Sequence, residues 1–92
     1  MHVVVSYYGQ AGHAVGIDRE RLEIEAKATL RQVCAEMARR HGAAFADLVL
    51  APGGDLRGNV LVSINDEVVD REQDPVLESG DEVAFFTALS GG

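Results

Sequence analysis

The most reactive feature of the sequence is its last pair of residues, Gly91-Gly92. Glycine has no Cβ, so a chain end of this kind can enter a narrow tunnel and bring its backbone close to reacting groups. The group on offer is the α-carboxylate of Gly92, which resists acyl substitution until it is activated, for example by adenylation with ATP. A sulfur or amine nucleophile then displaces AMP, in a site that a partner protein must supply. A trailing chain end without a chemical role is the alternative.

The other candidates for chemistry do not form a catalytic set. The histidines His2, His13 and His41 are widely spaced, without the i, i+4 spacing of a helical metal pair and without a thiolate cluster, so we expect surface histidines and no metal site. Cys34 lies on an apolar helical stripe and is expected to be a small buried hydrophobe, not a nucleophile. No carboxylate pair stands out as a general acid and base.

Two glycine-rich segments also lack a recognisable ligand motif. Residues 51–58 do not end in the Gly-Lys-Ser/Thr sequence of a phosphate-binding loop, and residues 9–16 lack the spacing of a dinucleotide fingerprint. The sequence therefore predicts no independent catalysis, and any reaction at the chain end depends on a partner.

Length and charge describe one small acidic domain. The chain has 92 residues, and eight Lys and Arg against fifteen Asp and Glu give a net charge of −7. This balance disfavours binding to nucleic acid or to anionic lipid and favours a partner with a basic docking face. Acidity for solubility alone is the alternative. No signal peptide and no apolar run of membrane-spanning length is visible, so we expect a cytoplasmic protein.

Patterning predicts the elements that must carry the chain end. Apolar and β-branched runs indicate buried strands, and residues 21–27 alternate so that Leu22, Ile24 and Ala26 face a core. In the last strand, alternation places Phe85 and Phe86 on opposite faces, so one of them should be less buried. The predicted strands are residues 3–8, 21–27, 60–64, 68–69 and 82–86, with a loop over 10–20 and a turn at 65–67.

One helix is predicted over residues 30–41. Thr29 and Gln32 have the spacing of a capping box, apolar residues recur at helical spacing, and Gly42 follows as a stop signal. Residues 43–59 remain open between a helical turn, an extended segment and a loop. The order of elements predicts an α+β fold, a mixed sheet packed on one main helix with its other face partly solvated.

Four stretches of the sequence resemble the ubiquitin-like sulfur carriers, and within them the small subunits of molybdopterin synthase. The stretches are residues 3–16, Thr29-Leu30-Arg31, residues 60–69, and residues 80–86 followed by Gly91-Gly92. The resemblance implies a β-grasp fold over residues 1–87 and a flexible C-terminal tail over residues 88–92.

The resemblance also implies a function for the chain end. An adenylating enzyme related to the ubiquitin-activating class is expected to activate Gly92, and a persulfide-derived sulfur to convert it to a thiocarboxylate. The tail would then enter the large subunit of molybdopterin synthase, or another sulfur-accepting enzyme. No cofactor is expected on the chain itself, because ATP is used by the activating partner. The residues expected to bind partners are Phe86, Ala88, Leu89, Ser90 and Gly91.

One departure from the family keeps other pathways open. Thr87-Ala88 stand where the synthase subunits usually have two prolines, and without proline a freer tail is expected. The alternatives are sulfur delivery to thiamine, cysteine or tRNA thiolation, and a ubiquitin-like modifier that joins Gly92 to lysine amines. A binding module without an activated chain end is a further alternative.

Overall fold

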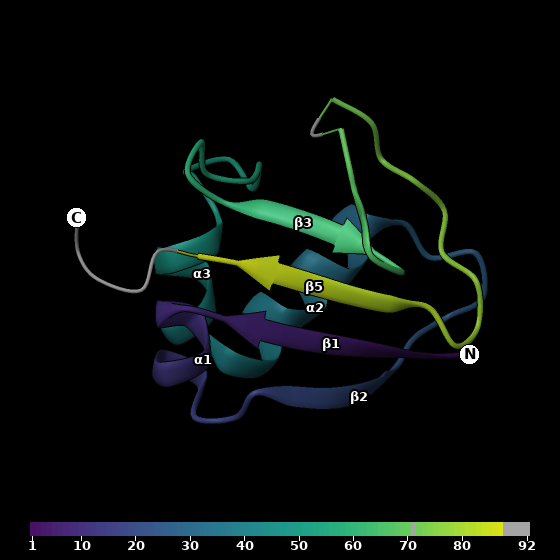
Figure 1. Cartoon of the computed structure of the whole chain (residues 1–92), viewed down its shortest axis with the longest axis horizontal. Coiled ribbons are helices and arrows are strands. Elements are labelled where there is room, and N and C mark those ends of the chain that lie inside the picture. The colour runs from purple at the N-terminus through teal and green to yellow at the C-terminus, as the bar shows by residue number, and fades with distance from the viewer. Residues whose placement is uncertain (71, 88–92) are drawn as a thin grey trace.

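The described residues form a five-stranded mixed sheet (Figure 1). The structure is a computed structural model, and it describes residues 1–70 and 72–87. Its strands are β1 (His2–Tyr8), β2 (Arg19–Glu23), β3 (Leu61–Ile64), β4 (Glu67–Val68) and β5 (Glu82–Phe86). The order is β2-β1-β5-β3-β4, in which β1 and β5 are parallel and all other neighbours antiparallel. The first and last strands are thus neighbours within the sheet.

Helices cover one face and one end of the sheet (Figure 1). They are α1 (Gln10–Val15), α2 (Leu30–His41) and α3 (Ala43–Val49). The long helix α2 lies across one face, whereas α1 and α3 lie at the end where β1 and β5 finish. None of the described helices covers the opposite face, which confirms the expected half-solvated sheet. Within the described residues, no helix is long and apolar enough to cross a membrane.

The prediction for α2 is confirmed over its full length. The Thr29 hydroxyl accepts a hydrogen bond from the Gln32 backbone N–H, and the Gln32 side chain accepts one from the Thr29 N–H, which completes the capping box. The apolar stripe of this helix is buried against the sheet.

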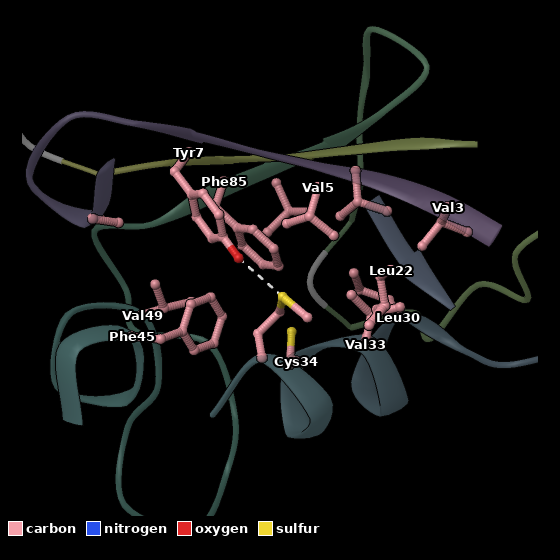
Figure 2. Packing of buried hydrophobic residues seen from close by; sticks show 14 of the residues in the cluster. Val3, Val5, Tyr7, Leu22, Leu30, Val33, Cys34, Phe45, Val49 and Phe85 are labelled. Atoms are coloured by element: carbon pink, nitrogen blue, oxygen red, sulfur yellow. Dashed lines mark hydrogen bonds between the residues drawn. The ribbon is translucent and has the colours of Figure 1, made fainter. Parts of the chain in front are cut away.

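An aromatic cluster ties α3 to the two central strands (Figure 2). Phe45 of α3 meets Phe85 edge to face, with ring centroids 5.2 Å apart, and Tyr7 lies nearly parallel to Phe85 at 6.3 Å. All three side chains are buried. Phe45 and Val49 are four residues apart and share one helical face. Burial of that face explains why residues 43–49, left open by the sequence, form a helix.

Two predictions are wrong, whereas the other predicted strands differ from the structure by at most one residue at either end. Residues 10–15, expected in a loop, form α1, which ends at Gly16. The strand expected over 21–27 is β2 and ends at Glu23, and Ala26 is exposed instead of facing the core. The early end has a physical reason, because β2 pairs with β1 only as far as Glu23 opposite His2, and residues 26–27 then form a turn in which Lys27 has a left-handed backbone (φ 66°).

Candidate functional site

The candidate site begins where the chain leaves β5. Phe86 is the last residue of that strand, and Thr87 is the last described residue. The predicted site residues Ala88, Leu89, Ser90, Gly91 and Gly92 lie outside the described residues, so their roles stay predictions. The structure defines the residues that precede this segment, up to Thr87.

Three exposed apolar side chains stand beside this point, one on each of three neighbouring strands. The register pairs Tyr8 of β1 with Phe86 of β5, and Phe86 with Leu61 of β3. The rings of Tyr8 and Phe86 are stacked, with centroids 4.9 Å apart and planes 9° apart. Their exposed fractions are 52% for Tyr8, 39% for Phe86 and 54% for Leu61. We call these three residues, two aromatic and one aliphatic, the aromatic row.

The aromatic row lies on the sheet face opposite α2. Neighbouring positions on that face carry small side chains, Ser6, Ala84 and Ser63, which are almost completely buried. Beyond them, Glu82 pairs with Arg19 at 3.2 Å and accepts a hydrogen bond from Ser6 at 3.2 Å. A cluster of large exposed apolar groups with a polar rim is typical of a protein-binding surface.

The sequence located one member of the row and missed two. Alternation predicted that one of the two phenylalanines would be less buried, and Phe86 is the exposed one, while Phe85 is buried. Tyr8 and Leu61 were missed as site residues. The same alternation places Tyr8 on the other face of the sheet from the buried Tyr7. Only the pairing of β1 and β3 with β5 brings Tyr8, Phe86 and Leu61 together.

Thr87 fastens the end of β5 to the start of α1. Its backbone N–H donates to the Tyr8 carbonyl at 2.9 Å, and its hydroxyl donates to the same carbonyl at 2.8 Å. The hydroxyl also accepts from the Ala11 N–H at 3.0 Å. The N-cap of α1 is Gly9, which has no side chain for this task. A threonine 76 residues from Ala11 therefore caps the helix.

Gly9 leaves no room for a side chain at this junction. Its φ is +87°, and a Cβ there would lie 1.9 Å from the Thr87 carbonyl oxygen. Gly16 has a similar φ of +89°, with a left-handed ψ of 3° and open space around it, whereas Gly9 has a ψ of −148°, in a region that essentially only glycine adopts. We expect Gly16→Ala to cost roughly 1–2 kcal/mol of backbone strain, and Gly9→Ala a further ~1–3 kcal/mol from its more restricted backbone region and from steric overlap with Thr87. Urea unfolding of both variants measures the difference, and equal losses would contradict the close contact.

His41 is not an ordinary surface histidine, contrary to the sequence-based expectation. Its side chain is only 16% exposed, and its Nε2 lies 2.5 Å from the Glu20 carboxylate. The same carboxylate accepts hydrogen bonds from the Tyr7 hydroxyl at 2.6 Å and from Arg40 at 2.7 Å. Glu20 thus joins β2 to β1 and to the end of α2, which is a structural role.

The Glu20 cluster makes stability depend on pH. Burial alone raises the pKa of Glu20, but the hydrogen bonds from Tyr7, Arg40 and His41 outweigh it and hold that pKa below its usual value. A lowered pKa means that the stabilisation is present above the unfolded pKa of ~4.3 and is lost as pH falls through the folded value.

We therefore expect Glu20→Gln to lower the free energy of unfolding by about 1.5–3 kcal/mol at pH 7. The gap between variant and wild type should narrow as the pH falls below the unfolded pKa of ~4.3, because the Glu20 carboxylate is then protonated first in the unfolded state. Denaturant unfolding across this pH range tests both statements. Glu23→Gln, which removes an exposed pair with Arg21, is the matched control and should cost less than about 1 kcal/mol. A gap that stays constant down to pH 3 would contradict the role assigned to Glu20.

The remaining candidates show no catalytic arrangement. Cys34 is buried as expected, and burial raises the pKa of its thiol to about 12, so it is a poor nucleophile. His13 is exposed. Within residues 1–70 and 72–87, no cluster of three or more His, Cys, Asp or Glu side chains is placed to hold a metal ion.

Known proteins share both the sequence pattern and the fold. Residues 5–92 match the ThiS family, and no curated protein matches the chain. Among solved structures, the chain is similar to a Pyrococcus furiosus protein assigned as molybdopterin converting factor, subunit 1, with 27% identity, 96% of this chain and 98% of that chain covered, and a TM-score of 0.74.

Two further structures extend the likeness. For the Amycolatopsis orientalis BexX/CysO complex the identity is 26%, the coverage 98% of this chain and 99% of that chain, and the TM-score 0.69. For SAMP1 of Haloferax volcanii the identity is 21%, the coverage 100% of both chains, and the TM-score 0.83. The sheet with α2 across one face is thus the ubiquitin-like β-grasp fold, here with the additional short helices α1 and α3 among the described residues.

Proposed function

The chain belongs to the ThiS family, among the ubiquitin-like sulfur carriers and modifiers, and on this premise we propose that it carries sulfur on the carboxyl group of Gly92. A carboxylate oxygen of Gly92 attacks the α-phosphate of ATP, which releases pyrophosphate and leaves an acyl adenylate. The terminal sulfur of a persulfide then attacks the acyl carbon, and AMP departs. A thiol cleaves the resulting acyl disulfide, which leaves the thiocarboxylate and a disulfide.

The observation that carries this proposal is the aromatic row at the end of β5. Phe86 stands six residues before Gly92 and is exposed, although an aromatic ring of this size is normally buried. Clustered exposed aromatics are typical anchors of protein interfaces. We assign to the row the docking of the adenylating enzyme and of the sulfur-accepting enzyme, with the segment 88–92 entering the partner's active site. One structural neighbour is itself part of a complex, which supports docking on an enzyme partner.

The chemistry divides between the chain and its partner. This chain supplies the reacting carboxyl group and the docking surface. The partner supplies the ATP site and the donors that stabilise the charge developing in the transition state. The acidic surface, with a net charge of −7, favours encounter with a partner whose docking face is basic. No cofactor of its own is needed, and the cytoplasmic location stays a prediction.

We assign the sulfur to molybdopterin biosynthesis. Residues 80–86 resemble the closing motif of the synthase small subunits, and the similarity to the Pyrococcus furiosus protein supports the same pathway. The partners are then an adenylating enzyme of the ubiquitin-activating class and the large subunit of molybdopterin synthase. The second candidate is sulfur delivery to another pathway or attachment to lysine amines, which the similarity to CysO and to SAMP1 favours.

Intact-mass spectrometry of the protein isolated from its native host tests the proposal. A population in which one terminal oxygen of Gly92 is replaced by sulfur is expected. Conjugates linked through Gly92 to lysine side chains would instead favour the modifier, and neither species in sulfur-replete cells would contradict both. Conversion of a cyclic pyranopterin by the thiocarboxylate and the synthase large subunit tests the pathway.

A further inference from the structure

The junction between Thr87 and α1 fixes the position of the last described residue. Three hydrogen bonds hold Thr87, two of them to the Tyr8 carbonyl and one from the Ala11 N–H. Tyr8 is also the residue that stacks on Phe86. The last described residue is therefore tied directly to the docking surface.

The close fit of Gly9 adds a steric limit to these hydrogen bonds. The backbone of Gly9 lies directly against that of Thr87, since a Cβ on Gly9 would come within 1.9 Å of the Thr87 carbonyl oxygen. Residue 87 is thus held both by hydrogen bonds and by backbone packing.

Direction matters because the segment beyond Thr87 is short. Gly92 is the fifth residue after Thr87, and five residues span at most ~18 Å when extended. With the docking surface seated on a partner, the position that Gly92 reaches depends on where Thr87 lies and how the chain departs from it. An error of about 1 Å in the placement of a reacting group can lower a rate by about 100-fold.

From this geometry we infer that Thr87 is a positioning residue, whose hydroxyl aligns the chain end with the aromatic row so that the Gly92 carboxylate meets ATP in the partner's site. The inference rests on the proposed function and adds a residue to it. In this role Thr87 acts through the placement of the chain end, without contact with ATP or with the reacting carboxyl group. Its effect is on the turnover number of adenylation, while binding of the partner remains the task of the row.

The variants Thr87→Val and Thr87→Ser separate the hydroxyl from the shape of the side chain. Valine keeps the branched shape but leaves the Ala11 N–H without its acceptor, whereas serine keeps the hydroxyl. Thr29→Val is the matched control, because it removes the hydroxyl that caps α2. Thr29 pairs with Val76 in the segment ahead of β5, whereas Thr87 follows β5, so the control lies away from the chain end.

The experiment measures ATP–pyrophosphate exchange with a purified adenylating enzyme of the ubiquitin-activating class from the same organism. For Thr87→Val we expect kcat to fall about 10- to 100-fold with KM nearly unchanged. Thr87→Ser should stay within about twofold of wild type, since its hydroxyl reaches the same partners. Thr29→Val should leave kcat unchanged although it removes a comparable cap. Amide hydrogen exchange at Ala11 should be faster in Thr87→Val only, which reports the loss of the hydrogen bond independently of activity.

Three results would overturn the inference. One is a Thr87→Val variant with wild-type kcat, and another is an equal loss in Thr29→Val, which would show a general effect of stability. The third is a rise in KM without a change in kcat, which would make Thr87 a docking residue. A wild-type protein that supports no exchange at all would instead overturn the proposed function, and the positioning role with it.

Discussion

A chain with one alanine added after Gly92 is expected to form no detectable thiocarboxylate. The added peptide bond consumes the carboxyl group of Gly92, and the new terminal residue carries a Cβ that a tunnel built for glycine does not admit. Incubation with ATP, the adenylating enzyme and a sulfur donor, followed by intact-mass spectrometry, measures the product. Wild type should gain the mass difference between sulfur and oxygen, whereas the extended chain should keep its mass.

The matched control inserts the same alanine between Gly53 and Gly54, in an exposed loop far along the chain from β5. This variant should form thiocarboxylate at the wild-type level. Removal of Gly92 is a second test, because it leaves the carboxyl group of Gly91 one residue short. Urea unfolding should give the same midpoint for the wild type and both chain-end variants. Thiocarboxylate on the extended chain would rule out Gly92 as the reacting residue.

Truncation of Phe86 is expected to produce the largest loss in partner binding. The exposed ring stacks on Tyr8 and stands in register with Leu61, so it is the central member of the row. A central aromatic anchor contributes about 2 kcal/mol or more to an interface, which corresponds to roughly 30-fold weaker binding for Phe86→Ala. Calorimetry with the adenylating enzyme measures the dissociation constant.

Val76→Ala is the control for this variant. Val76 is also a large exposed apolar residue, but it lies in the segment ahead of β5 and outside the row. Its truncation should change the dissociation constant less than twofold. The double variant Tyr8→Ala/Phe86→Ala should lose less than the sum of the single losses, since the two rings act as one stacked unit. Equal losses of affinity for Phe86→Ala and Val76→Ala would show that the row is not part of the interface.

The elements with strong local patterns could be predicted from the sequence. The capping box at Thr29 and Gln32 marks the start of α2. The turn expected over 65–67 lies at Asn65 and Asp66, both with positive φ, and Glu67 already belongs to β4. Alternation in β5 separated a buried from an exposed phenylalanine. Each of these signals lies within a few residues, where propensity and periodicity act directly.

Helix α1 could not be predicted, for a reason that the structure makes plain. Its N-cap is a glycine, glycines also lie within it and behind it, and the hydroxyl that caps it belongs to Thr87. No local sequence pattern contains that contact. Similarly, His41 was expected to be a surface histidine, and only the antiparallel pairing of β2 with β1 places Glu20 against it.

The candidate site, like the fold, could be predicted from the sequence only in part. The sequence by itself determined an acidic α+β domain with a chemically available Gly92 and one exposed phenylalanine near it, since composition, alternation and motif spacing are properties of the chain. Only the tertiary structure decided that Tyr8 and Leu61 join Phe86 and that Thr87 is tied to α1. Alternation assigns a side chain to a face of its own strand, but the pairings that build the row join Tyr8 to Phe86 and Phe86 to Leu61, residues 78 and 25 positions apart, which no local pattern encodes.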